Sequence, residues 1–161
     1  MTTDRFPLAR LLALIVPGAL LGGALASQYV GGLYPCELCW FQRYPHIVAL
    51  VLAVLAFVVP GRGTQRLLVA LAAVAVLVSG AIGVFHAGVE YHWWQGITAC
   101  TMTISGGGRS TDAMLKDLLA APIVRCDAAQ WTLLGVSLAG WNAALSLVGA
   151  GVIGWLLRRR V

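Results

Sequence analysis

Long uncharged runs, separated by short polar clusters, dominate the chain. Four strongly apolar stretches contain no Asp, Glu, Lys or Arg, and they are residues 11–36, 44–61, 67–89 and 128–157. About 20 helical residues cross a hydrocarbon core of about 30 Å, so each run is long enough, or nearly so, to span a membrane. Continuous apolar runs rich in Leu, Ala and Val predict helices, because only helices and closed barrels satisfy the backbone in lipid. We therefore expect four transmembrane helices, over 11–30, 39–59, 67–87 and 134–157.

The second of these helices contains a proline. A start at Pro45 would leave residues 45–59, which rise only about 22 Å at 1.5 Å per residue and fall short of the hydrocarbon core. We therefore predict a helix that begins near Cys39 and tolerates Pro45 as a kink. That start places Arg43 at or just inside the membrane interface.

The composition agrees with this pattern. Of 161 residues, 60% are hydrophobic and 11% are charged, against roughly 45–50% and 25% in soluble domains. A soluble globule of this size leaves too much surface exposed to hide so many apolar side chains, which excludes a soluble enzyme, a disordered chain and a small disulfide-stapled module. We expect an all-α membrane protein, a four-transmembrane-helix bundle in a single domain over 1–161. The net charge of +5 gives no reason to expect nucleic acid, since basic residues lie mostly at the ends of apolar runs.

Basic residues are distributed unevenly between the two sides of the membrane. The N-terminal segment, the 60–66 loop and the C-terminus hold seven of the eleven Lys and Arg residues and one acid. Positive residues in short flanks mark the cytoplasmic side. We expect both termini in the cytoplasm, contact with membrane lipid throughout, and two outer, periplasmic loops at about 31–38 and 88–133.

The first helix has a second interpretation. Arg5, Arg10, the apolar run and Ala24-Leu25-Ala26 are also typical of a cleaved signal peptide. The apolar run continues past that site, however, and cleavage would leave an odd number of spans. The membrane-spanning interpretation is therefore preferred.

All four cysteines fall in or beside the outer loops, where disulfides persist. Cys36 and Cys39 form a Cys-x-x-Cys in the first loop, and Cys100 and Cys126 lie in the second. A Cys-x-x-Cys disulfide is a strained ring of the kind that is labile and catalytic, and its loop is too short to confine much chain. A helix N-terminus at Cys39, with Arg43 one turn later, favours the Cys39 thiolate. For Cys100 and Cys126 a plain structural disulfide is an equal alternative.

Metal sites are the weaker interpretation of these cysteines. A zinc or iron–sulfur site with four thiolates usually brings two close pairs, and the second pair here is not Cys-x-x-Cys. Trp40 directly follows Cys39, which excludes the Cys-x-x-Cys-His attachment of a c-type haem. We expect no metal.

Further polar and small residues lie along the helices. His86 and Glu90 are four residues apart at the outer end of the third helix, where ionisable groups indicate either proton handling or an interfacial hydrogen-bonded pair. His46 and His92 are expected at the membrane interface. Glycines at 18, 22, 80 and 83 predict close helix approach, and a short helix is expected over 111–119.

The residues from Cys36 to Arg43 read Cys-Glu-Leu-Cys-Trp-Phe-Gln-Arg, which resembles the Cys-x-x-Cys…Gln/Glu-Arg signature of the DsbB family. The family comprises bacterial inner-membrane oxidoreductases that reoxidise the periplasmic dithiol oxidase DsbA and pass the electrons to quinone. The order of features is also similar: four spans, Cys-x-x-Cys in the first outer loop and a second cysteine pair in the second. The resemblance extends over nearly the whole chain.

The resemblance implies a role for each cysteine. Cys100 would form a mixed disulfide with the partner, Cys126 would relay to Cys36, and Cys39 would face the quinone ring as a thiolate with Arg43 beside it. Gln42, His86 and Glu90 complete the expected quinone site, and ubiquinone is the first candidate for the quinone. The implied function is oxidation of a DsbA-type partner with transfer of electrons to the membrane quinone pool. A small membrane scaffold or transporter subunit with structural disulfides in its outer loops is the non-enzymatic alternative.

Overall fold

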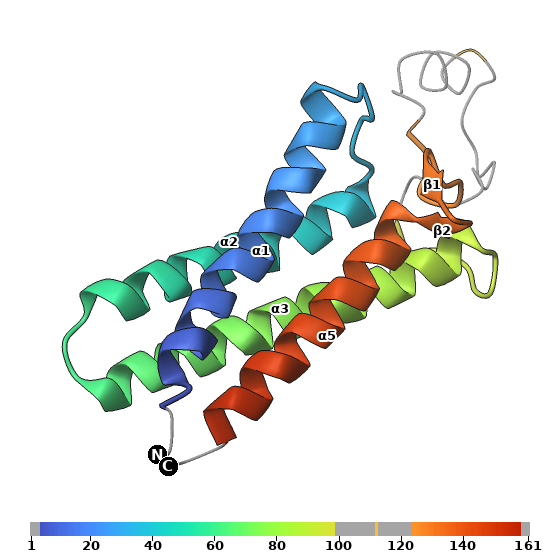
Figure 1. Cartoon of the computed structure of the whole chain (residues 1–161). Coiled ribbons are helices and arrows are strands. Elements are labelled where there is room, and N and C mark those ends of the chain that lie inside the picture. The colour runs from blue at the N-terminus through green and yellow to red at the C-terminus, as the bar shows by residue number, and fades with distance from the viewer. Residues whose placement is uncertain (1–3, 99–111, 113–123, 159–161) are drawn as a thin grey trace.

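The computed structural model describes residues 4–98, 112 and 124–158. Its four long helices are α1 (Phe6–Tyr29), α2 (Glu37–Val58), α3 (Arg62–Glu90) and α5 (Leu138–Arg158). Each is long and apolar enough to cross a membrane, which confirms the expectation of an all-α, four-helix membrane protein. The helices form an elongated bundle in which both termini lie at one end and the α1–α2 connection lies toward the other (Figure 1).

The helix ends differ from the predicted spans mainly at the basic end of the bundle. α1 begins at Phe6 and α3 at Arg62, five residues earlier than predicted in each case. The prediction followed the hydrocarbon core, whereas a helix continues into the headgroup region where arginines are solvated. The side chain of Asp4 accepts a hydrogen bond from the Phe6 N–H at 3.1 Å and forms an ion pair with Arg62. α2 runs through Pro45, as predicted.

A small hairpin precedes the last helix. Strands β1 (Thr132–Leu133) and β2 (Val136–Ser137) pair antiparallel, so α5 begins at Leu138 and the predicted start at 134 is wrong. The two turn residues, Leu134 and Gly135, have φ angles of 54° and 77°. Two successive positive φ angles are typical of a type I′ hairpin turn, in which glycine is favoured. The apolar character of this stretch indicated burial or lipid contact but not its backbone conformation.

Small residues form the core of the bundle. α3 packs against both α2 and α5. Most of the fully buried core side chains are alanines, and they include Ala9, Ala13, Ala49, Ala53, Ala56 and Ala72. A Cβ added to Gly83 would lie 3.0 Å from the backbone nitrogen of Ala143, and one at Gly80 would lie 3.1 Å from Leu147, so these glycines allow α3 and α5 to approach closely. A Cβ added to Gly22 would meet nothing within 4 Å, so the prediction of a close helix approach at this glycine is wrong.

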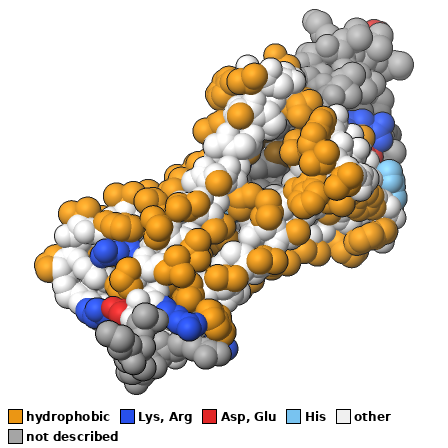
Figure 2. Space-filling model, in the orientation of Figure 1, with side chains coloured by type: hydrophobic (Ala, Val, Ile, Leu, Met, Phe, Trp, Pro, Cys, Tyr) orange, Lys and Arg blue, Asp and Glu red, His pale blue; other side chains and the backbone are white. Residues whose placement is uncertain are grey.

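The outer surface of the bundle is largely apolar, as a protein surrounded by lipid requires. Hydrophobic side chains cover most of the visible face, and arginines gather at the end of the bundle that carries the termini (Figure 2). In the absence of a hydrophobic driving force between helices, small residues inside and large apolar residues outside are the expected arrangement.

Candidate functional site

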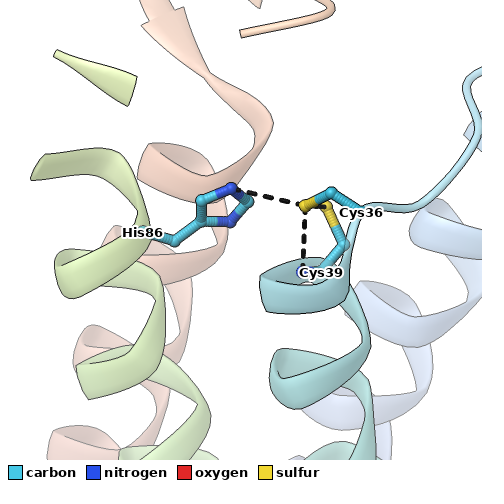
Figure 3. A group of neighbouring side chains, drawn as sticks. All are labelled: Cys36, Cys39 and His86. Atoms are coloured by element: carbon cyan, nitrogen blue, oxygen red, sulfur yellow. Dashed lines mark hydrogen bonds between the residues drawn. The ribbon is translucent and has the colours of Figure 1, made fainter. Parts of the chain in front are cut away.

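The Cys-x-x-Cys segment lies where α2 begins. Cys36 is the N-cap residue, with an extended backbone (φ −76°, ψ 176°), and its Sγ accepts a hydrogen bond from the Cys39 N–H at 3.3 Å. The Sγ atoms of Cys36 and Cys39 lie 2.8 Å apart (Figure 3). Both cysteines are free thiols. The helix start therefore holds two sulfurs close enough to form or open a disulfide with little backbone movement.

Cys126, near the C-terminal end of the second loop, packs against Cys36 of this pair. It is fully buried and packs in one cluster with Cys36 and Leu38. Its sulfur accepts a hydrogen bond from Thr98 Oγ1 at 3.5 Å and faces the Cys36 thiol and the backbone N–H groups of Glu37 and Leu38. These donors, the Cys36 thiol first, lower the pKa of Cys126 to about 5 in spite of its burial. Cys126 thus favours the thiolate form at the N-terminus of α2, where helix amides stabilise negative charge.

The same contact has the opposite effect on Cys36. The pKa of the Cys36 thiol is raised. The largest cause is the neighbouring sulfur of Cys126, followed by that of Cys39 and by burial of the thiol. Between these two thiols, the shifts favour the negative charge on Cys126 and the proton on Cys36. A thiolate beside a sulfur that can enter a disulfide is the arrangement that thiol–disulfide exchange requires.

His86 and Glu90, the pair predicted at the outer end of the third helix, lie beside Cys36. His86 Nε2 is 3.5 Å from Cys36 Sγ (Figure 3) and 3.7 Å from Glu90 Oε1, and the side chains of both residues are buried. His86 also hydrogen-bonds the main-chain carbonyl of Cys126. Ser137, in strand β2 of the hairpin before α5, lies beside the Glu90 carboxylate.

Arg43 is a buried cation whose partners are neutral. Its guanidinium donates to Gln28 Oε1 at 2.5 Å and to the Ala24 carbonyl at 3.1 Å, and it lies 5.0 Å from the centroid of the Trp40 ring. No carboxylate among the described residues pairs with it. Both hydrogen-bond acceptors belong to α1, so a chain cleaved after Ala26 would lose the Ala24 contact and the helix that holds it.

A buried polar network lies deeper between α2, α3 and α5. Gln42 donates to the Leu38 carbonyl at 3.2 Å and to His86 Nδ1 at 2.7 Å. Asn142 of α5 donates to Gln42 Oε1 at 2.8 Å, and its own oxygen lies 2.9 Å from His46 Nε2. The network thus connects the imidazole beside the cysteines to a second imidazole further along α2.

A cavity of about 350 Å³ opens along this network. Cys36, Cys39, Arg43 and the network residues form its polar side, and its other walls are mostly apolar side chains of α1 and α5, which include Ala19, Leu20, Leu138, Ala139 and Leu145. Its size and its largely apolar lining are typical of a small-molecule site. Both sulfurs of the Cys-x-x-Cys and the Arg43 guanidinium belong to residues that line it.

The structure brings together seven of the eight residues predicted to form the site. Cys36, Cys39, Arg43, Gln42, His86 and Glu90 line the cavity, and Cys126 contacts Cys36. Cys100 lies outside the described residues, as does the predicted helix over 111–119 apart from Asp112.

The deeper part of the network, around His46, differs from the prediction. His46 was predicted at the membrane interface, and this is wrong: its side chain is 3% exposed and is hydrogen-bonded between helices. Ser79 and Asn142, the partners of His46, are not among the residues predicted to form the site. His46, Ser79 and Asn142 each interrupt an apolar run, which indicates a buried polar contact. The sequence does not indicate that these three side chains meet.

Three of the site residues also have the spacing of metal ligands. The ligand atoms of Cys36, Cys39 and His86 all lie within 4.8 Å of one another. Two thiolates on a tetrahedral zinc with Zn–S near 2.3 Å are about 3.8 Å apart, whereas the two sulfurs here are 2.8 Å apart. The geometry therefore favours a redox pair over two ligands of one zinc ion.

Comparison with known proteins adds independent evidence. The family model described as disulfide bond formation protein DsbB matches residues 6–156. Two similar proteins are named disulfide bond formation protein B: one from Polaromonas sp., 33% identical with 94% of each chain covered, and one from Marinobacter nauticus, 31% identical with 82% of this chain and 80% of the relative covered. A third, from Verminephrobacter eiseniae, is 31% identical over 96% of this chain and 89% of the relative. No solved structure matches the chain.

Proposed function

The chain belongs to the DsbB family of disulfide bond formation proteins, and from that premise we propose that it oxidises a periplasmic thioredoxin-like dithiol oxidase of the DsbA type and delivers the electrons to membrane quinone. Family membership and the four spans make it a multi-pass membrane protein of disulfide bond formation. The partner, the quinone and the residue roles below are the content of the proposal.

The proposed orientation places both termini in the cytoplasm and the cysteines at the periplasmic face of the inner membrane. The starts of α1 and α3 and the end of α5 lie at the end of the bundle with the termini, and they carry the arginines at residues 5, 10, 62, 66 and 158. The Cys36–Cys39 pair and Cys126 lie at the opposite end. Positive residues on the cytoplasmic side support this orientation.

The residues that line the cavity fit a quinone. Its apolar walls suit a substituted ring and a prenyl tail, and its polar side includes the guanidinium of Arg43, the amide of Gln42 and the imidazoles of His46 and His86. Arg43 has no carboxylate partner among the described residues, so a group that gains negative charge beside it would be stabilised. Bound quinone would supply a two-electron, two-proton acceptor.

In the proposed exchange, a thiolate of the partner attacks Cys100 of a Cys100–Cys126 disulfide and releases the Cys126 thiolate. Cys126 attacks Cys36 of the Cys36–Cys39 disulfide, which forms a Cys36–Cys126 bond and releases the Cys39 thiolate. The partner's second thiol resolves the mixed disulfide and frees Cys100. Cys100 then attacks Cys126, which restores the Cys100–Cys126 disulfide and leaves Cys36 and Cys39 as a dithiol that holds two electrons.

Residues around the cysteines have a role in each of these steps. The N–H groups of Glu37 and Leu38 hold Cys126 as the attacking thiolate. His86, 3.5 Å from Cys36 Sγ, is placed to receive or return the proton of that thiol, with Glu90 beside it. Arg43, one turn after Cys39, holds a fixed positive charge on the cavity side of the same helix.

One observation carries the proposal most directly. Cys126, a residue of the second loop, is buried against Cys36, and Cys36 and Cys39 line the cavity. A structural disulfide within each loop needs no such contact between the two cysteine pairs.

The test is turnover with defined components. Purified protein in detergent is mixed with a reduced thioredoxin-like partner and a ubiquinone with a short tail, and partner oxidation and quinone reduction are followed together. We expect one quinol for each partner disulfide, and no quinol with Cys39→Ser. Partner oxidation without quinol formation would overturn the quinone assignment, and no partner oxidation would overturn the proposal as a whole.

A further inference from the structure

His46 ends the buried network on the side away from the cysteines. Its Nε2 lies 2.9 Å from both Asn142 Oδ1 and Ser79 Oγ. Its Nδ1 is buried and has no hydrogen-bond partner among the described residues. His46 also lines the cavity. A buried polar atom without a partner is rare and calls for a physical explanation.

Two backbone carbonyls fix the direction of every hydrogen bond in this network. The Leu38 carbonyl can only accept, so the atom of Gln42 that faces it is Nε2, and the other, Oε1, accepts from Asn142 Nδ2. The amide oxygen of Asn142 therefore faces His46 Nε2. An amide oxygen has no hydrogen to give, so this bond requires a hydrogen on Nε2.

Ser79 leads to the same assignment. Its hydroxyl donates to the Gln42 carbonyl at 2.8 Å, so its single hydrogen is used and its oxygen meets His46 as an acceptor. With the hydrogen on Nε2, the neutral ring carries a bare lone pair on Nδ1. His46 thus presents a hydrogen-bond acceptor whose partner is missing among the residues that the structure describes.

We propose that His46 Nδ1 accepts a hydrogen bond from a hydroxyl group of the ring bound in the cavity, so that the cavity prefers a hydroxyl-bearing ring over the same ring without a hydroxyl hydrogen. The inference rests on the quinone site proposed above and names its selectivity. A phenol or quinol hydroxyl completes the acceptor, whereas a carbonyl or ether oxygen places one lone pair against another. His46 is then a specificity residue for the reduced form of the ligand.

Binding of a matched pair of redox-inert probes tests this inference without turnover. The probes are a phenol with a short prenyl chain and its methyl ether, and quenching of tryptophan fluorescence reports binding, because Trp131 and Trp141 line the cavity. One hydrogen bond to a buried acceptor predicts that the protein binds the phenol about 10-fold more tightly than the ether. His46→Phe, which keeps a ring but has no lone pair, is expected to bring the ratio near one. His92→Gln, an exposed histidine outside the cavity, is the matched control and should keep the ratio.

A second measurement does not depend on the fold of a variant. Nitrogen-15 NMR of histidine-labelled protein distinguishes a protonated from a bare ring nitrogen. We expect Nδ1 of His46 to be bare in the ligand-free protein and to shift on addition of the phenol but not of the ether. A hydrogen on Nδ1, or a phenol-to-ether ratio that His46→Phe leaves unchanged, would overturn the inference.

Failure of this inference and failure of the proposed function give different results. If short-tailed ubiquinone binds but the two probes bind equally, the His46 assignment is wrong and the quinone site stands. If neither probe nor the ubiquinone binds, the quinone site and this inference are overturned together.

Discussion

The low pKa of Cys126 rests on identifiable donors, and one of them can be removed with little change in shape. Thr98 is buried, and its Oγ1 donates to Cys126 Sγ at 3.5 Å. Thr98→Val replaces that hydroxyl with a methyl group of similar size. Thr98→Ser keeps the hydroxyl and loses only the methyl group, so the pair separates the hydrogen bond from the packing.

The size of the effect follows from the hydrogen bond that is lost. Hydrogen bonds to charged groups contribute roughly 1.5–3 kcal/mol, and a long bond to sulfur belongs at the lower end of this range. At 1.36 kcal/mol for each pKa unit, Thr98→Val should raise the pKa of Cys126 by about one unit. From a starting pKa of about 5, the thiolate fraction at pH 6 falls from about nine-tenths to about half, and at pH 8 it hardly changes.

The assay needs a background in which no disulfide exchange occurs. Cys39→Ala with Cys100→Ala leaves Cys36 and Cys126, the two thiols that share a hydrogen bond. Ultraviolet absorbance of the thiolate between pH 4 and 8, under reducing conditions, then reports the first ionisation. Because the pKa is lowered, the thiolate is present above about pH 5 and is lost as the pH falls through this value.

Two results would refute the reasoning. If Thr98→Val and Thr98→Ser titrate alike, the hydroxyl does not stabilise the thiolate. If the first ionisation in the parent background lies in the ordinary thiol range, the cluster at the start of α2 does not hold Cys126 as a thiolate at all, and the proposed attack on Cys36 loses its nucleophile at neutral pH.

Three further predictions concern the electron path and the orientation. A partner variant that keeps only its attacking cysteine should be trapped on Cys100, seen as a mixed disulfide on a non-reducing gel, because the partner thiol that resolves this bond is gone. Trapping at the Cys-x-x-Cys instead would reverse the proposed path. Arg43→Gln should slow quinone reduction by at least about 100-fold, the usual effect of removing one preorganised charge-stabilising group, while single-turnover disulfide transfer to the partner persists. Arg43→Lys should slow quinone reduction less, because the charge is kept. Wild-type quinone kinetics in Arg43→Gln would make the residue a membrane anchor. A topology reporter near Gly63 should read as cytoplasmic and one near Gly107 as periplasmic, and a periplasmic reading at Gly63 would invert the proposed orientation.

The fold was largely predictable because lipid simplifies the problem. Four uncharged runs give four helices, since the backbone has few other ways to satisfy its hydrogen bonds in a membrane. The errors lie at the ends of the runs. The hairpin before α5 depends on the positive φ angles of Leu134 and Gly135, and hydropathy says nothing about backbone angles.

The site was predictable where its residues are close in sequence or fixed by family signature. Cys36, Cys39 and Arg43 follow from one short motif. The burial of Cys126 against Cys36 follows from no spacing and was anticipated only through resemblance to the DsbB family. The network through His46 was missed, because the partner that holds it, Asn142, lies 96 residues away in sequence and meets it only when α2 and α5 pack together.

The central claim is that electrons leave the protein's thiols for quinone, and a free-thiol count tests it most directly. Fully reduced protein with all four cysteines is incubated with one equivalent of short-tailed ubiquinone in the absence of oxygen, and its thiols are counted after denaturation in acid. The account predicts the loss of two thiols with formation of one quinol, and no loss when Cys39 is replaced by serine. A thiol count that stays at four in the presence of quinone would contradict it and would leave the protein as a membrane scaffold with structural cysteines.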